Sequence, residues 1–222
     1  MSESPGTHAP APALRTAPLD TYLGRLAARE PAPGGGAAAA VHAAQGAALV
    51  AMVARYSTGP KYATHAERIA EITTETDDLR ERALTLADED AAAFTAVTDA
   101  YRLPKGTPEE KSARSGAIAA ALLGAAPPPA ALLSLAERIV SLAEELLPLG
   151  NPNVVTDVAA AAEAARAAAS TARVNVEINL GGIKDTDARE RLTTTLGRTD
   201  PLLARAEAVT AEVRRRLEPE NG

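Results

Sequence analysis

Three acidic residues in a row, Asp88, Glu89 and Asp90, stand where a charged stretch of the chain becomes apolar. Asp90 shares one helical face with Phe94 and Tyr101, four and eleven residues further along. A carboxylate at such a boundary is partly removed from water, which raises its pKa toward the range that suits general acid–base catalysis. The alternative interpretation is a solvated acidic patch in the middle of a helix.

A run of three glycines, Gly34, Gly35 and Gly36, precedes a long apolar stretch with helical character. Clustered backbone N–H groups at a helix N-terminus form an anion site that holds a carboxylate or a phosphate. The spacing is neither that of a P-loop, which needs Gly-Lys-Ser/Thr, nor that of a dinucleotide fingerprint, which follows a strand. The alternative is a tight turn that requires positive φ angles.

Four asparagines form two pairs. Asn175 and Asn179 lie one helical turn apart in an apolar run, so their amides need another helix or a ligand as a hydrogen-bond partner. Asn151 and Asn153 lie in a turn shortly before Asp157. Capping of the next helix is the commonest use of asparagine there, and binding of a ligand is the alternative.

Two further residues have a simple explanation beside a functional one. Lys105 is a cation next to a predicted helix N-terminus, where most lysines are surface residues. His42 lies in the middle of the most apolar predicted helix. We expect a buried, hydrogen-bonded core histidine there, with a role at the site as the alternative.

The elements that must position these side chains are helices. Of the 222 residues, 46% are hydrophobic but only 2% are aromatic, which excludes ordinary β-sandwiches and barrels. Alanine, the best helix former, dominates and lets helices approach closely. We therefore predict an all-α, elongated up-and-down bundle of long helices, and we prefer a helix to an isolated strand at 173–179. The predicted helices span 18–29, 37–56, 63–101, 108–125, 129–150, 155–183 and 199–216.

Composition also excludes several functional classes. The chain has no cysteine and only three histidines, at positions 8, 42 and 65, so we predict no metal site. A net charge of -6 gives no bias toward nucleic acid, and no apolar run reaches about 18 residues, so we expect no membrane span. Residues 1–17 are typical of a disordered lead-in rather than a signal peptide, followed by one domain at 18–218. A cytoplasmic protein is the expectation.

The chain resembles the cyclodeaminase/cyclohydrolase family, which comprises the cyclodeaminase part of formiminotransferase-cyclodeaminase and stand-alone methenyltetrahydrofolate cyclohydrolases. The resemblance rests on PAPGGGAAAAVHAAQGAALVAMVA, LADEDAAAFTAVTDAYRLPKGTPEEKSAR and LGNPNVVTDVAAAAEAARAAASTARVNVEINL, and it covers about 18–217. It implies an all-helical subunit that forms a homodimer. It also implies one folate cleft built from the glycine loop, the acidic cluster, the Lys105 loop and the turn at 150–153.

The resemblance implies a tetrahydrofolate derivative as substrate and no permanently bound cofactor. A cyclohydrolase opens the methenyl bridge with water, whereas a cyclodeaminase closes formiminotetrahydrofolate and releases ammonia. Both reactions pass through a tetrahedral carbon next to a delocalised cation, which a carboxylate stabilises while it relays a proton. The candidates for that carboxylate are Asp88, Asp90 and Asp157.

The other candidates bind the substrate. Lys105 and the amides of Gly34–Gly36 would hold the folate carboxylates, and Asn151, Asn153, Asn175 and Asn179 would read the pterin edge. Phe94 and Tyr101 are the main aromatic side chains available to stack on a pterin, and His42 is an added candidate.

The chain departs from the family pattern at a few positions. Ala37 follows the glycines where relatives commonly have serine, and His42 and Gln45 replace small or apolar residues. These departures raise a second hypothesis, a repurposed enzyme that acts on a non-folate amidine, imine or amine. A third is a non-catalytic helical dimer that binds a ligand. The leading hypothesis is a one-carbon folate enzyme, and a stand-alone chain slightly favours the cyclohydrolase.

Overall fold

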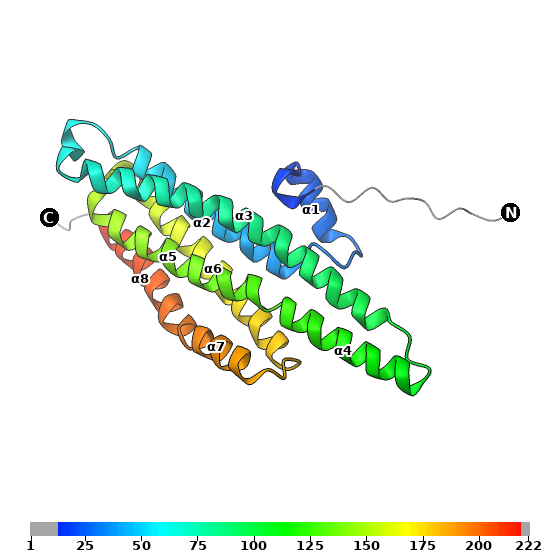
Figure 1. Cartoon of the computed structure of the whole chain (residues 1–222). Coiled ribbons are helices and arrows are strands. Elements are labelled where there is room, and N and C mark those ends of the chain that lie inside the picture. Colours follow the sequence, from blue (N-terminus) through cyan, green and yellow to red (C-terminus); the bar gives the residue numbers. More distant parts are fainter. Residues whose placement is uncertain (1–12, 219–222) are drawn as a thin grey trace.

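The computed structural model describes residues 13–218, and every regular element in that range is a helix. This confirms the all-α prediction. Figure 1 shows the chain from the short helix α1 to the C-terminal helix α8. The α-helices are α1 (Leu19–Ala27), α2 (Gly35–Arg55), α3 (Ala66–Arg102), α4 (Pro108–Gly124), α5 (Pro127–Leu149), α6 (Val155–Leu180), α7 (Thr186–Gly197) and α8 (Thr199–Leu217).

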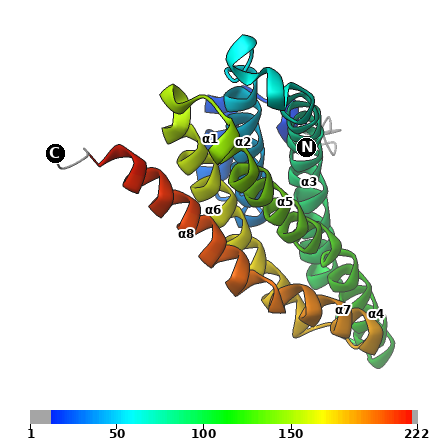
Figure 2. The same ribbon diagram turned by 90° about the vertical axis from the view of Figure 1, so that its left-hand side faces the viewer.

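The long helices lie alongside one another in an elongated bundle, as Figures 1 and 2 show from two sides. Helix α2 packs against α3, α5 and α6, and α6 also contacts α8. The second half of α3 and all of α4 form a hairpin arm that extends beyond the other helices in Figure 1. No residue of α4 is buried, so α4 lies outside the core.

Most helix boundaries follow the predicted signals. Thr107 and Glu110 form the expected capping box at the start of α4, and the segment 173–179 is helical. The predicted cap of α6 is wrong. Asn151 instead accepts a hydrogen bond from the Asn153 amide, at 3.0 Å, and caps the short 3-10 helix Pro152–Val154. This extra turn separates the asparagines from the start of α6, whose N-cap is Val154.

Regular structure begins before residue 18, where the sequence predicted the domain to start. Leu14–Thr16 form a 3-10 helix, and the Leu14 side chain is buried in the core. The Leu14 amide donates a hydrogen bond to the Asp88 carboxylate at 2.6 Å. Residues 13–17 are thus placed against α3, while the rest of the predicted lead-in, 1–12, lies outside the described residues.

Small residues set the distance between α2 and α6. At Gly46 a Cβ would lie 3.0 Å from the carbonyl oxygen of Ala161 and 3.4 Å from Ile139 Cγ2, so the two backbones nearly touch. Ala161 and Ala165 in α6 are fully buried. The alanine-rich composition therefore serves a thin, close-packed core around α2.

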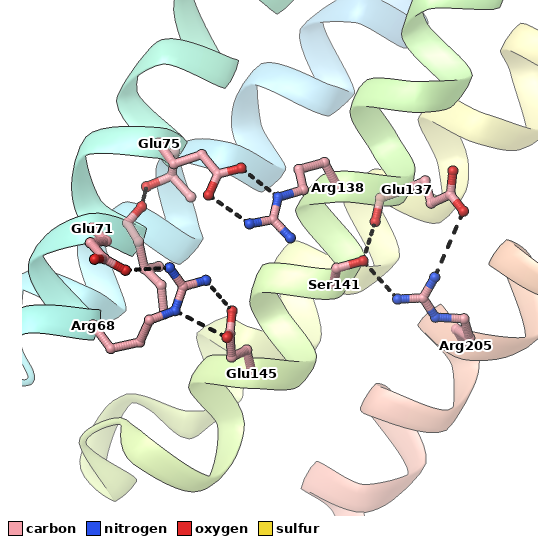
Figure 3. Close-up of polar contacts among 10 residues, drawn as sticks. Arg68, Glu71, Glu75, Glu137, Arg138, Ser141, Glu145 and Arg205 are labelled. Atoms are coloured by element: carbon pink, nitrogen blue, oxygen red, sulfur yellow. Dashed lines mark hydrogen bonds and ion pairs between the residues drawn. The ribbon is translucent and has the colours of Figure 1, made fainter. Parts of the chain in front are cut away.

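Ion pairs connect α5 to two of the helices beside it, α3 and α8 (Figure 3). Arg68 of α3 binds Glu145, with Nε and Oε1 3.0 Å apart, and Arg138 binds Glu75 of α3. Hydrogen bonds from these arginines hold the pKa of Glu145 and of Glu75 below the ordinary value. These side chains are partly exposed, so each pair contributes little to stability and mainly fixes the alignment of the helices.

The expectation that no segment could span a membrane does not hold by length and composition alone. Helix α2 and the stretch Pro108–Leu149 are both long and apolar enough to cross a membrane. These properties are weak evidence for a membrane span, because the core helices of soluble proteins share them. Helix α2 is mostly buried inside the bundle.

The α2–α6 contact gives a stability test. We expect Gly46→Val to lower the free energy of unfolding by about 1–3 kcal/mol, because the added methyl groups have no room beside the α6 backbone. Gly116→Ala in α4 is the matched control, since a Cβ there meets nothing within 4 Å. It should stabilise by about 0.5–1 kcal/mol through helix propensity. Urea unfolding followed by circular dichroism measures both, and equal effects would contradict this account of the contact.

Candidate functional site

A cleft of about 560 Å³ opens where the N-terminus of α2 meets the second half of α3 and the end of α6. This volume suits a small organic ligand. Eight of the predicted site residues line it: Gly34, Gly35, Gly36, Asp90, Phe94, Tyr101, Asn175 and Asn179. The structure thus brings together three segments that are far apart in the sequence.

Asp90 is the only acidic or basic residue among the described residues that line the cleft. Its carboxylate lies at the N-terminus of α2 and accepts a hydrogen bond from the backbone amide of Ala37. Partial burial raises the pKa of Asp90 above its ordinary value, and the hydrogen bond opposes this only in part. The anion at this helix N-terminus is therefore a side chain of the protein itself, which modifies the prediction that the glycine amides hold substrate carboxylates.

Gly36 is required by the position of Asp90. A Cβ at Gly36 would overlap the Asp90 carboxylate, whereas a Cβ at Gly35 would meet only Thr171 Cγ2, at 3.8 Å. Both glycines have ordinary negative φ angles, because Gly59 is the only described residue with positive φ. The alternative prediction, a turn that needs positive φ, is therefore wrong, and the reason for glycine here is close approach.

The two amides of α6 have different surroundings. Asn179 donates from Nδ2 to the carbonyl oxygen of Ala125 at 3.0 Å, which ties the end of α6 to the α4–α5 junction. Asn175 Nδ2 is buried and has no hydrogen-bond partner in the described structure. An unsatisfied buried donor is costly, so Asn175 is the amide that is ready to bind a ligand or a partner.

The remaining walls of the cleft are apolar and open. The side chains of Phe94, Tyr101 and Ile178 are 51%, 52% and 75% exposed, although all three line the cleft. Leu122 of α4 packs onto Gly182, where a Cβ would overlap it. Exposed apolar walls next to a partly buried carboxylate are a surface that a flat, partly apolar ligand would cover.

Asp88 and Glu89 do not face the cleft, although they adjoin Asp90 in the sequence. Asp88 accepts the hydrogen bond from the Leu14 amide, and Glu89 pairs with Arg82 at 2.6 Å. Successive helical residues point about 100° apart, so only one member of the cluster faces α2.

A second group of predicted residues lies at the opposite end of α2. The Asn151 side chain donates to the Tyr56 carbonyl oxygen at 3.0 Å, and Tyr56 follows the last residue of α2. Asp157 is in the first turn of α6, 18 residues before Asn175, which corresponds to about 27 Å along the helix. Within one chain, Asn151, Asn153 and Asp157 therefore do not join the cleft.

Two more candidates lie outside the cleft lining. Lys105 is exposed in the loop between α3 and α4, just beyond Tyr101. Arg114 lies over the Tyr101 ring, 5.5 Å from its centre, and is a nearby cation that the sequence did not single out. His42 is exposed on α2, so the expectation of a buried core histidine is wrong. The uniformly apolar sequence of α2 conceals one face that points outward.

Several cleft residues were missed by the sequence reasoning. Val97 and Ile178 had a usable signal, because they continue the helical spacing of Phe94 and Asn175. Gly181 and Gly182 also line the cleft, directly after the end of α6. The other missed residues come from the loop before α2, from α3 and from the α4–α5 junction: Pro31, Ala93, Leu122 and Ala125.

Comparisons with known proteins identify the family of the chain. The family model of formiminotransferase-cyclodeaminase matches residues 18–198, which is most of the chain. The chain belongs to this family. A methenyltetrahydrofolate cyclohydrolase from Methylorubrum extorquens is 38% identical over 197 residues, covering 88% of this chain and 93% of that protein. The predicted resemblance is therefore confirmed.

Two other members of the formiminotransferase-cyclodeaminase family show the range of relatives. The formimidoyltransferase-cyclodeaminase of Rattus norvegicus is 34% identical over 210 residues, covering 94% of this chain but 38% of the rat protein. The crystal structure of a formiminotetrahydrofolate cyclodeaminase from Thermotoga maritima superposes with a TM-score of 0.77 at 27% identity. It covers 92% of this chain and 97% of that one, so the whole bundle is shared.

The contact of Gly36 with Asp90 makes a direct prediction for this family member. We expect Gly36→Ala to reduce kcat/KM by about 100-fold, since displacing a catalytic group by about 1 Å costs this much. Gly35→Ala, the neighbouring comparison, should have a far smaller effect because its Cβ has ordinary contacts. Steady-state kinetics measures both, with circular dichroism as the check on folding. Equal losses in the two variants would contradict a specific role for position 36.

The raised pKa of Asp90 predicts a pH-dependent stability. Above about pH 3.9, the ordinary pKa of aspartate, the unfolded chain releases this proton while the folded chain still holds it. The free energy of unfolding contributed by Asp90 therefore falls as the pH rises through the folded pKa, and stays low at neutral pH. Asp90→Asn should thus raise the melting temperature at pH 7, with a smaller gain at pH 4. A melting temperature that falls equally at both pH values would contradict the assignment.

Proposed function

We propose that this protein is a one-carbon folate enzyme, with methenyltetrahydrofolate cyclohydrolase as the leading activity. The 38% identity to a cyclohydrolase that this chain covers almost end to end supports this choice. The observation that carries the proposal is the Asp90 carboxylate, partly buried in an open cleft with no competing cation in its lining.

The chemistry follows from that carboxylate. The methenyl bridge of the substrate is a delocalised cation, and a carboxylate beside it lowers the energy of the positive charge. When water adds to the bridge carbon, Asp90 accepts one of its protons, and its raised pKa makes it a stronger base than an ordinary aspartate. Asp90 can then return that proton to the departing ring nitrogen as the bond from this nitrogen to the bridge carbon breaks, while the hydroxyl group on the bridge carbon loses its own proton to solvent and becomes the formyl carbonyl.

The other groups of the cleft suit the rest of a folate. The free Nδ2 of Asn175 can donate to an acceptor on the pterin edge, and Phe94 and Tyr101 offer exposed aromatic surface for stacking. Lys105 and Arg114 lie beyond Tyr101, at the end of the cleft farthest from Gly36 along α3. We assign to these two cations the carboxylates of the folate tail.

Formiminotetrahydrofolate cyclodeaminase is the second candidate activity. It is favoured by the shared bundle of the Thermotoga maritima enzyme that carries this name. The same groups serve it, because the reaction passes through the same tetrahedral carbon and the same cation. Release of ammonia then replaces the addition of water.

The hypothesis of a repurposed enzyme, which acts on a non-folate substrate, rests on departures from the family sequence. The geometry of the cleft gives it less support. The Ala37 side chain is fully buried, and His42 is exposed on α2 but is not among the described residues that line the cleft, so neither departure changes this lining. A purely ligand-binding role explains poorly why a carboxylate is kept partly desolvated. The homodimer, the cytoplasmic location and the absence of a permanent cofactor, nucleic-acid partner or membrane contact remain parts of the proposal.

The proposal is tested with the purified protein and methenyltetrahydrofolate, whose near-ultraviolet absorbance disappears on hydrolysis. We expect enzyme-dependent loss of this absorbance, and a decrease in kcat of at least about 100-fold in Asp90→Asn. Asp78→Asn is the matched control, because Asp78 lies on the same helix but is exposed to solvent. Ammonia release from formiminotetrahydrofolate tests the second candidate. Turnover of neither substrate, without folate binding by calorimetry, would refute the folate assignment.

A further inference from the structure

Two carboxylates of α3 hold the two ends of one N-terminal segment. Asp88 accepts the hydrogen bond from the Leu14 amide at 2.6 Å, and Asp90 accepts one from the Ala37 amide. Side chains two residues apart leave a helix about 200° apart, so the two carboxylates point to nearly opposite sides of α3. Residues 14–37, which we call the wrapping segment, therefore pass from one side of α3 to the other.

Between these two hydrogen bonds, the wrapping segment contributes one wall of the cleft. Pro31 and the three glycines Gly34–Gly36 line the cleft. Residues 28–31, which connect α1 to this wall, are exposed and belong to no helix. A loop with so little packing of its own takes its position from the elements that flank it. The position of Pro31 therefore depends on how α1 and the residues before it are held.

The apolar and ionic contacts of those residues do not fix their position along α3. The Leu14 and Tyr22 side chains are 8% and 6% exposed, but burial of apolar surface is non-directional. The Tyr22 hydroxyl is buried without a hydrogen-bond partner in the described structure. Arg15 pairs with Glu81 at 2.7 Å, but these two side chains are 40% and 52% exposed, so the pair contributes little.

The hydrogen bond between Leu14 and Asp88 is directional and stronger. Leu14 is the first residue of the 3-10 helix Leu14–Thr16, so its amide lacks a partner within that helix. Asp88 is only partly exposed, and a hydrogen bond to an ionised carboxylate is roughly twice as strong as one between neutral groups. This bond therefore determines where on α3 the wrapping segment begins.

We propose that Asp88 is a positioning residue, which holds the wrapping segment across α3 and thereby fixes the Pro31 wall of the cleft for the substrate. Asp88 is not among the described residues that line the cleft, so it acts through the segment and not on the reacting atoms. The kinetic part of this inference rests on the proposed folate function. The part that concerns the position of the wall does not.

The proposed role affects substrate binding more than the chemical step. Without the Asp88 hydrogen bond, the wrapping segment also populates a loosened position in which Pro31 leaves the wall. The apparent affinity for substrate falls by the fraction of molecules that keep the described position. Asp90 stays in place, because Gly36 and Ala37 beside it are buried at the start of α2. The bound substrate thus reacts at nearly the ordinary rate.

The first test separates KM from kcat. We expect Asp88→Ala to raise KM about 10-fold with little change in kcat, since a hydrogen bond to a charged group is worth about this factor. Asp88→Asn should recover most of the loss, because its amide oxygen still accepts from the Leu14 amide. Glu81→Ala is the matched control, because it removes the exposed ion pair to the same segment, and its KM should change less than 2-fold.

Two results of this test would overturn the proposal. A loss of kcat in Asp88→Asn as large as that in Asp90→Asn would show that the Asp88 carboxylate acts in the chemistry. An unchanged KM in Asp88→Ala would show that the wrapping segment is held without it.

The second test measures the segment without substrate. The chain has no cysteine, so a nitroxide can be attached at one site through Gly24→Cys in α1 or Glu30→Cys beside Pro31. A Cβ at Gly24 meets nothing within 4 Å, and Glu30 is exposed. We expect Asp88→Ala to narrow the electron paramagnetic resonance spectrum at both sites, and Asp88→Asn to narrow it far less. A label at Ala208→Cys, on the exposed surface of α8, is the control and should not respond.

The outcomes distinguish the two proposals. Greater mobility at both sites, in a protein that turns over no folate, would refute the folate function and leave the positioning role of Asp88 standing. An unchanged spectrum at position 30 in an active enzyme would refute the positioning role and leave the folate function standing. Equal narrowing at position 208 would show general loosening of the fold and would also overturn the positioning role.

Discussion

The close approach of α2 and α6 is the constraint on which the rest of the structure depends. At Gly46 the two backbones leave no room for a side chain, and most of the buried residues of both helices are glycine or alanine. The thin contact lets both helices expose one uncharged face while burying the other. It also fixes the relative heights of their ends, so the N-terminus of α2 lies beside Thr171 and Asn175. The cleft is a consequence of that alignment, and the composition that produces it is the same excess of alanine that makes the sequence unusual.

The Asp90 carboxylate of the site lowers the stability of this core. A carboxylate that is held partly away from water destabilises the fold, and the amide of Ala37 offsets only part of that cost. The position is nevertheless well defined, because Gly36 leaves a space that only the carboxylate fills. The chain thus places an energetically unfavourable group at the junction of two helices that are otherwise packed by small apolar residues. Such a conflict between stability and chemistry is expected where a protein reacts or binds.

The sequence alone predicted most of the fold and half of the residues that line the cleft. Helical spacing and the capping box at Thr107 predicted the long helices, because these signals are local, but the short helix α7 (Thr186–Gly197) was not predicted. Asp90, Phe94 and the glycines were predicted together because α3 carries its site residues in one row. His42 was predicted wrongly, since a helix of uniformly small apolar residues does not reveal which face is outward. Asn153 and Asp157 were placed in one cleft with Asn175 on the resemblance to the family, and a resemblance contains no information about which ends of two antiparallel helices meet within one chain.

The distance between those two groups is itself informative. If Asp157 were only a surface residue, its unused acceptor and the unused donor of Asn175 would have no relation to each other. They instead leave the same helix in the same direction, with an uncharged face between them whose apolar side chains remain exposed. Exposed apolar surface and unsatisfied polar groups both raise the free energy of the protein. At the Asn175 end of this face the two costs coincide beside Asp90, because the free Nδ2 of Asn175 and the exposed side chain of Ile178 line the same cleft. A molecule that accepts a hydrogen bond from Asn175 and covers Ile178 would lower both costs at once.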